Sequence, residues 1–315
     1  MSTAVEHRTV HDIQIAAPAA VVYEIIADAT HWPVYFPPTV HVLRTELDEW
    51  TERLQLWATG AGVVRAWSSI RTLDADQRCI SFHREFSVPP VKSMLGKWLI
   101  EPRGDAAVRL VLIHDFEAVD DDPANIAWIT RATDENSLAE MGNIKKLAES
   151  WDTIGERELA FDDVVRVRGS AEHVYEFLHD CGAWPDRLPH VAELDLREED
   201  DGALQLMSMW SLAKDGSRHL TVSARVCFPA ERIVYKQTLT PEMIDAHAGE
   251  WTVEPAGDDV LVRSRHRVLL SERALGFVPA AGDTWASTRD FVERSIKGNS
   301  AVTLAHAKAY AEQRA

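Results

Sequence analysis

The sequence predicts an α+β protein with two copies of one domain, each a curved antiparallel sheet wrapped around a long C-terminal helix, with an interior pocket. Three observations lead to this prediction. The two halves of the chain repeat each other, both halves order their strands and helices in the same way, and each half contains a strand with one polar face.

The repeat relates residues that lie about half a chain length apart. Val22-Tyr23-Glu24 recurs as Val174-Tyr175-Glu176 and Trp32-Pro33 recurs as Trp184-Pro185, in both cases 152 residues later. Solenoids and propellers repeat every 20 to 50 residues or so, and two copies of this length therefore indicate a duplicated globular domain. We expect an N-terminal domain of residues 1–155 and a C-terminal domain of residues 156–315.

The first copy opens with a strand and two helices. Apolar and polar residues alternate from His7 to Ala16, which predicts a strand, and Pro18 suits the first turn of a helix that runs through Ile26. Trp32-Pro33 indicates a short second helix. Six further strands fit the span from there to about Ala118.

A long helix closes each copy. Asp122-Pro123 is a plausible cap and first turn, and helical spacing predicts a helix from about Asp134 to Ser150. In the second copy the same reasoning predicts a helix from about Thr284 to Tyr310, with Asn299 on its mixed inner side.

Composition excludes several functions. The 315 residues include 33 basic and 50 acidic side chains, a formal charge of −17 that repels nucleic acid. Cys79, Cys181 and Cys227 form no metal-ligand cluster, and we expect neither a metal nor a cofactor. The N-terminus lacks the features of a signal peptide, and no apolar run is long enough to cross a membrane, so we expect a soluble cytoplasmic protein.

One strand in each copy has a polar face. Alternation puts Trp67, Ser69 and Arg71 on one side of the first strand. In the second copy it groups His219, Thr221, Ser223 and Arg225. A solvent-facing strand side is the ordinary explanation of such a pattern, but its recurrence in both copies favours a pocket lining.

Two histidines and several tryptophans are further candidates for the pocket. His114 and His266 occur in apolar alternations that predict inward-facing side chains, as hydrogen-bonded core residues or as pocket groups. Trp32, Trp57, Trp67 and Trp98 offer flat walls for a planar ligand.

These segments resemble the aromatase/cyclases of bacterial polyketide biosynthesis. Trp67-Ser68-Ser69-Ile70-Arg71 matches their W-x-S-x-R strand, and Trp32-Pro33 followed by Phe36-Pro37, with Tyr35, is similar to their W-P-x-x-F-P turn. The duplication and the tail Gly298-Asn299-Ser300 resemble the di-domain class that serves type II polyketide synthases. The resemblance implies a helix-grip, START-like fold in each half.

The resemblance also implies a reaction. Members fold a poly-β-ketone held on an acyl carrier protein, direct aldol closure of the first ring between its seventh and twelfth carbons, and promote dehydration to the aromatic ring. Other components of the type II synthase are then partners, and neither nucleic acid nor membrane is.

The family's roles can be carried onto this chain residue by residue. Arg71 would anchor and polarise a ketone, Ser69 and Tyr35 would orient oxygens, and Trp67 would shape the cavity. The second copy keeps Ser223 and Arg225, but Thr221 replaces the tryptophan and Arg187 replaces Tyr35. The candidate catalytic set is Arg71, Ser69, Tyr35, Arg225, Ser223, His114 and His266. The candidate substrate-binding set is Trp67, Trp32, Trp98, Thr221, Arg187, His219 and Asn299.

Three functions remain open at this point. Arginine stays protonated and suits stabilisation of enolate and alkoxide charge, while His114, His266 or a held water is a candidate base. The same architecture serves carriers of lipids and other apolar ligands that perform no chemistry. A third possibility is a scaffold that docks to a synthase and has one or both pockets unused.

Overall fold

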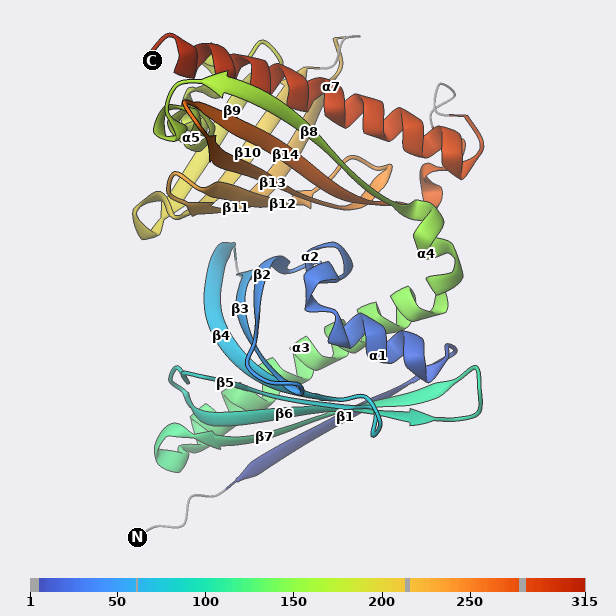
Figure 1. Ribbon diagram of the computed structural model, residues 1–315. Helices are drawn as coiled ribbons and strands as arrows, with labels where there is room; N and C mark the ends of the chain where they lie inside the picture. The colour runs from blue at the N-terminus through green and yellow to red at the C-terminus, as the bar shows by residue number, and fades with distance from the viewer. Residues whose placement is uncertain (1–5, 61, 213–215, 278–281, 315) are drawn as a thin grey trace. The chain divides into compact units, whose positions relative to one another are not determined.

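The computed structural model describes residues 6–60, 62–212, 216–277 and 282–314. The chain forms two compact units, one built mainly from residues before Ile154 and the other mainly from Ile154 onward. Each unit has one seven-stranded sheet and one long helix (Figure 1). No helix in the described part of the chain is long and apolar enough to span a membrane.

The first unit follows the predicted order of a strand, two helices, a six-strand meander and a closing helix. Its sheet has the strand order β1-β7-β6-β5-β4-β3-β2. Its elements are β1 (His7–Ile15), α1 (Ala19–Ala27), a 3₁₀ turn (Ala29–His31), α2 (Trp32–Tyr35), β2 (Thr39–Glu46), β3 (Thr51–Gly60), β4 (Val63–Asp74), β5 (Cys79–Arg84), β6 (Val91–Pro102), β7 (Val108–Ala118) and α3 (Pro123–Glu149).

The second unit repeats this order after helix α4 (Trp151–Arg157), and its sheet has the order β8-β14-β13-β12-β11-β10-β9. The tandem duplication is therefore confirmed. The elements are β8 (Glu158–Arg168), α5 (Ala171–His179), α6 (Trp184–Arg187), β9 (Val191–Glu199), β10 (Leu204–Leu212), β11 (Arg218–Phe228), β12 (Arg232–Leu239), β13 (Ile244–Ala256), β14 (Asp259–Leu270) and α7 (Trp285–Glu312).

The closing helix of the first unit begins earlier than the sequence predicted. Asp122 caps α3 by accepting hydrogen bonds from the backbone N–H groups of Ala124 and Asn125, and Pro123 occupies the first turn. The predicted cap and first turn at Asp122-Pro123 are therefore confirmed, whereas the predicted start of the long helix at about Asp134 was wrong. Ile129 packs against Phe116 and Ala118 of β7 and stabilises the first turns of α3, which lack a strong apolar stripe.

The two closing helices are held to the first strand of their own unit in the same way. Lys145 of α3 donates to the Gln14 carbonyl at 2.8 Å, and Lys308 of α7 donates to the Arg166 carbonyl at 2.7 Å. The two lysines are 163 residues apart in sequence. At the same spacing Ser137 of α3 corresponds to Ser300 of α7, and both serines are buried.

Candidate functional site

One row of residues crosses the middle of each sheet. In the first unit Arg71 pairs with Phe82, Phe82 with Gly96, Gly96 with His114, and His114 with Thr9. Residues directly opposite each other in an antiparallel sheet project from the same face. The predicted arginine and histidine therefore share one side of the sheet.

The second unit repeats the row with two changes. Arg225 pairs with Tyr235, Tyr235 with Gly249, Gly249 with His266, and His266 with Phe161. Tyr235 thus takes the place of Phe82, and Phe161 takes the place of Thr9.

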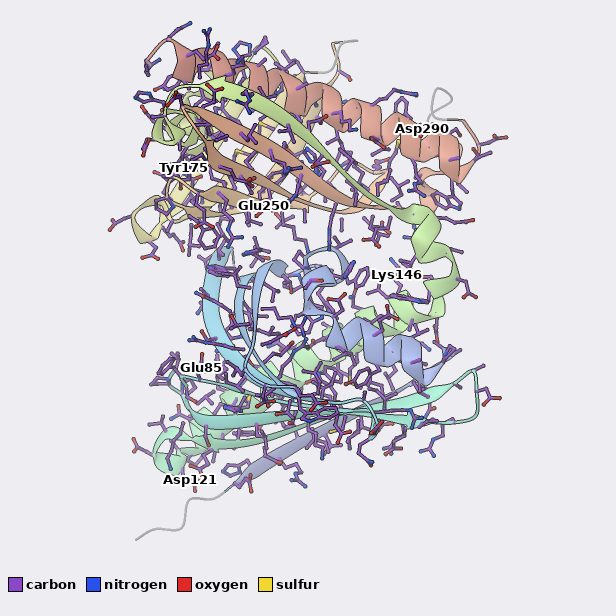
Figure 2. The ribbon with its side chains drawn as sticks, in the orientation of Figure 1. Glu85, Asp121, Lys146, Tyr175, Glu250 and Asp290 are labelled. Atoms are coloured by element: carbon purple, nitrogen blue, oxygen red, sulfur yellow. The ribbon has the colours of Figure 1, made fainter. Side chains whose placement is uncertain are left out.

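This row faces the closing helix. Ser300 of α7 hydrogen-bonds at 2.9 Å to Ser264, which lies two residues before His266 on the same strand. Arg225 donates to the Leu178 carbonyl of α5, which lies on the same side of the sheet. Figure 2 draws the side chains of this unit, with Tyr175 of α5, Glu250 of β13 and Asp290 of α7 labelled.

A glycine at the centre of each row lets an aromatic ring lie flat across the sheet. A Cβ atom on Gly249 would stand 2.2 Å from the ring of Tyr235, and one on Gly96 would stand 2.1 Å from the ring of Phe82. Only glycine permits this approach, and it holds the Tyr235 hydroxyl next to His266.

Arg71 is buried and held by three acceptors. Its Nε–H donates to the carboxylate of Glu52, and its two terminal nitrogens donate to the carbonyls of Ile26 and Ala27 at the end of α1. Burial lowers the pKa of Arg71 below its ordinary value, and the Glu52 carboxylate opposes that effect. Three of its five N–H bonds are occupied.

Arg225 is fully buried with fewer partners. One terminal nitrogen donates to the Leu178 carbonyl, whereas Nε and the other terminal nitrogen have no hydrogen-bond partner. Among the residues that the structure describes, no carboxylate forms an ion pair with Arg225. Gln205, its direct cross-strand partner, stands where the first unit has Glu52.

Tryptophan rings cover both guanidinium groups. The Arg71 guanidinium carbon lies 5.0 Å from the ring centre of Trp32, and that of Arg225 lies 5.5 Å from Trp184. Trp251 is a second aromatic neighbour of Arg225, at 5.9 Å. Such cation–π contacts stabilise a guanidinium group without neutralising it.

His266 is the centre of a buried hydrogen-bond network. The Tyr235 hydroxyl and Nε2 of His247 each lie 3.1 Å from Nδ1 of His266. On the other side of the ring, the Ser264 hydroxyl lies 3.1 Å from Nε2, and Ser300 donates to Ser264. The network connects β12, β13, β14 and α7.

Within residues 6–60 and 62–153 the first unit has no counterpart of this network. Phe82, Met94 and Leu112 occupy the positions that correspond to Tyr235, His247 and Ser264. Nδ1 of His114 and the Ser137 hydroxyl are buried without a hydrogen-bond partner.

Burial keeps the three inner histidines neutral. It lowers the pKa of His114 to about 4, of His247 to about 3 and of His266 to about 4, because the folded interior disfavours the imidazolium ion. The same effect raises the pKa of Tyr235 above its ordinary value. At neutral pH these groups are hydrogen-bond donors and acceptors without charge.

The sequence matches known protein families. Two family models, both described as polyketide cyclase/dehydrase and lipid transport, match residues 6–149 and 167–289. The granaticin polyketide synthase bifunctional cyclase/dehydratase of Streptomyces violaceoruber is 38% identical over 98% of this chain and 95% of its own length. The actinorhodin polyketide synthase bifunctional cyclase/dehydratase of Streptomyces coelicolor is 38% identical over 99% of both chains.

This chain belongs to the polyketide cyclase/dehydrase family. Solved structures of two di-domain family members have the same fold over nearly the whole chain. The di-domain ARO/CYC BexL from the BE-7585A biosynthetic pathway aligns with a TM-score of 0.88 and 42% identity, over 97% of this chain and 99% of its own. The di-domain ARO/CYC StfQ from the steffimycin biosynthetic pathway aligns with a TM-score of 0.85, 27% identity and the same coverage.

Most of the residues that the family resemblance singled out are buried. Ser69, Ser223 and Thr221 join the two arginines on the inner strand faces, and the solvent-facing alternative is therefore wrong for these positions. Ser69 donates to the His83 carbonyl at 2.9 Å, while the Thr221 hydroxyl has no hydrogen-bond partner. The interior pocket itself stays a prediction.

The aromatic candidates differ in how deeply they are buried. Trp98 is buried in the core of the first unit, and Trp32, which is partly buried, donates from its indole nitrogen to the Ile25 carbonyl. Tyr35 is buried between His31 and Trp151, with ring centres 5.4 and 6.0 Å away. Trp67 is only partly buried and lies under the Arg84 guanidinium.

Two predicted substrate-binding residues, His219 and Asn299, are exposed, whereas Arg187 is partly buried. His219 is exposed and contacts the Ser217 hydroxyl, because it lies near the open end of β11. Asn299 is also exposed, since one residue of helical rotation places Ser300 on the inner side of α7 in its stead. Arg187 pairs with Asp180 at 2.9 Å.

Sequence reasoning missed the residues that distinguish the two units. These are Glu52 and Gln205 beside the arginines, and Tyr235, His247, Ser264 and Ser300 around His266. A comparison of the two copies at offsets of 152 and 153 would have paired Glu52 with Gln205 and Phe82 with Tyr235.

Glu140 of α3 is another missed candidate. Burial raises the pKa of this carboxyl group to about 7. It is one turn along α3 from Ser137, on the helix that covers the first sheet. A carboxylate with such a pKa is suited to accept a proton near neutral pH.

Proposed function

We propose that this chain is an aromatase/cyclase that acts on a poly-β-ketone held by an acyl carrier protein. It directs aldol closure of the first ring between the seventh and twelfth carbons and dehydrates the product to an aromatic ring. It needs no cofactor, and it works in the cytoplasm beside the other components of a type II polyketide synthase. Family membership and the two relatives named as cyclase/dehydratases support this proposal.

The observation that carries the proposal is the uncompensated charge of Arg225. A buried cation without an anionic partner costs several kcal/mol, because the protein interior replaces its hydration poorly. Aldol closure and dehydration both pass through enolate or alkoxide oxygens that carry developing negative charge. The two unpartnered nitrogens of Arg225 are donors for such an oxygen.

The two arginines then have different tasks. The Glu52 carboxylate, which also pairs with Arg44, offsets part of the charge of Arg71, and Arg71 keeps two of its five N–H bonds for a neutral ketone and is therefore suited to hold and orient the chain. Arg225 keeps its full charge for the later steps. The first pocket sets which carbons join, and the second completes aromatisation.

A non-catalytic carrier of a hydrophobic polyketide or lipid is the alternative. Such a carrier requires only an apolar cavity. A buried arginine without a carboxylate would destabilise its fold and would not help it to bind an apolar ligand. Arg225 therefore favours the enzyme over the carrier.

The test compares Arg71→Lys, Arg71→Ala and Arg225→Ala in a type II synthase reconstituted with its carrier protein. Arg71→Lys keeps the charge but loses the planar fork, and both Arg71 variants should lose the correct ring connectivity. Arg225→Ala should keep the connectivity and accumulate a product that is not aromatised. Arg294→Ala, which removes an exposed arginine of α7, is the matched control. Wild-type products from every variant, or no effect of the wild-type protein itself, would support the carrier instead.

A further inference from the structure

Resting on the proposed function, we propose that Tyr235 is the catalytic acid of the dehydration. Its hydroxyl protonates the departing hydroxyl group of the cyclised intermediate, and His266 replaces the proton that Tyr235 gives up. Ser264 then replaces the proton of His266, and Ser300 replaces that of Ser264. All four residues belong to the second domain.

The order of the residues along the sheet places the acid between the charge stabiliser and the relay. Tyr235 is the direct cross-strand partner of Arg225 on one side and, across Gly249, a neighbour of His266 on the other. Its hydroxyl lies 3.1 Å from Nδ1 of His266. An enolate oxygen held by Arg225 and a hydroxyl group near Tyr235 can therefore belong to one substrate.

The hydrogen bonds give the relay a direction. Ser300 donates to Ser264 at 2.9 Å, and Ser264 can donate to Nε2 of His266 at 3.1 Å. Nδ1 of His266 then carries the ring proton and donates to the Tyr235 oxygen, with Nε2 of His247 as a second acceptor at 3.1 Å. In this tautomer the Tyr235 proton is free to point at the substrate.

The proton and electron balance closes with water alone. The C–H bond next to the ketone breaks, its proton goes to water, and its electron pair becomes the new C=C bond through the enolate at Arg225. The C–O bond breaks and its electron pair leaves with the oxygen, which takes the proton of Tyr235 and departs as water. Each relay member passes one proton toward Tyr235, and a water proton refills Ser300.

Burial explains why a relay is needed. Because the interior disfavours a phenolate, Tyr235 holds its proton firmly unless a replacement arrives as the proton leaves. His266 is neutral, with its pKa lowered to about 4, and so it acts by exchanging its ring proton from one nitrogen to the other rather than as an imidazolium acid.

The first domain serves as an internal comparison. Phe82 lies over Gly96 there as Tyr235 lies over Gly249, but it has no hydroxyl group. Leu112 interrupts the path from the closing helix at the position of Ser264. A domain that only sets ring connectivity needs no proton relay.

The test uses the full-length Tyr235→Phe variant with a carrier-bound poly-β-ketone made in situ by a reconstituted synthase. The variant should fold, because phenylalanine already occupies the equivalent place in the first domain. We expect unchanged first-ring connectivity, accumulation of the hydroxylated cyclic intermediate, and dehydration slower by roughly 100- to 10,000-fold. Wild-type dehydration, or altered ring connectivity, would overturn the role of Tyr235 as acid.

Ser264→Ala tests the relay separately from the acid, with Ser137→Ala, which removes a buried hydroxyl group of the first domain, as the control. Ser264→Ala should slow dehydration and reduce its solvent deuterium isotope effect, because fewer protons then move together, while Ser137→Ala should change neither. If Ser264→Ala keeps the wild-type rate and isotope effect, the relay is wrong. If the wild-type protein itself fails to cyclise the poly-β-ketone, the proposed function fails, and this inference falls with it.

Discussion

Glu52 accepts a hydrogen bond from Arg71 inside the first domain, and the corresponding position in the second domain is occupied by Gln205. Both side chains are buried, so the difference between a carboxylate and an amide is not screened by water. The two domains therefore share one framework but present an arginine paired with a carboxylate in one case and an arginine beside an amide in the other.

Removal of the Glu52 charge should destabilise the protein strongly. Glu52→Gln leaves Arg71 buried without its carboxylate and also breaks the pair of Glu52 with the partly exposed Arg44, and loss of one partner of a buried ion pair typically costs about 3–5 kcal/mol. Glu85→Gln is the control, because it breaks the partly exposed Arg53–Glu85 pair, which should contribute about 0–1 kcal/mol. Urea unfolding of both variants measures the difference. Equal losses of unfolding free energy in the two variants would show that the buried Arg71–Glu52 pair contributes no more to stability than the partly exposed pair.

Gly249→Ala should displace the Tyr235 ring. The new Cβ atom would stand 2.2 Å from that ring, and overpacking of this kind usually costs about 1–3 kcal/mol. Gly298→Ala in α7 is the control, because nothing lies within 4 Å of its new Cβ atom and alanine favours a helix. Gly249→Ala should also impair dehydration, since the Tyr235 hydroxyl loses its distance to His266. A Gly249→Ala variant as stable and as active as the wild type would contradict the close approach of the Tyr235 ring to Gly249.

Much of the fold could be predicted because the sequence contains two copies of the same domain. The constant offset between Trp32-Pro33 and Trp184-Pro185 implied the duplication, and turn residues marked the strands. The stretch of α3 between the predicted Asp122 cap and Asp134 was missed, because it is stabilised by burial of Ile129 rather than by an apolar stripe.

The site could be predicted only in part. Alternation within one strand put Arg71 and Arg225 on an inner face, and the structure agrees. The partners of those arginines come from neighbouring strands whose register no single strand reveals, and so Glu52 and Tyr235 were missed. The bond from Ser300 to Ser264 joins a helix to a strand and depends on their packing.

The buried histidines should make stability depend on pH below neutrality. His114 faces Phe82 on β5, with His11 and Asp115 as the charged groups that affect it, and its pKa is lowered to about 4. An unfolded histidine binds a proton near pH 6.5, whereas folded His114 does so only near pH 4. Stability is therefore complete above about pH 6.5 and falls as the pH drops toward 4, by up to about 1.4 kcal/mol per pH unit for this group.

His114→Leu should flatten this dependence. Unfolding free energies of the variant and the wild type are compared from pH 7.5 down to the limit of reversible unfolding. At pH 7.5 the difference reports packing alone, because the histidine is neutral in the folded and unfolded states. An identical slope in both proteins would mean that His114 is charged in the folded state.

Transfer of the Glu52 arrangement to the second domain should slow aromatisation without loss of the fold. In wild type Gln205 donates to Glu198 at 2.7 Å and faces Arg225 across the strand pair. The double variant Gln205→Glu and Glu198→Gln exchanges the two groups, so the number of charges and the hydrogen bond between them are both kept. The new carboxylate can pair with Arg225 as Glu52 pairs with Arg71.

The swapped protein should be at least as stable as wild type, because the Arg225 charge gains the partner that it lacks. It should form the aromatised product roughly 100-fold more slowly, since the carboxylate competes with the substrate oxyanion for Arg225. Glu198→Gln alone leaves Arg225 unpaired and should retain activity. Thermal unfolding and the product profile with carrier-bound poly-β-ketone measure both effects. Wild-type aromatisation by the stable double variant would show that Arg225 does not hold a developing negative charge.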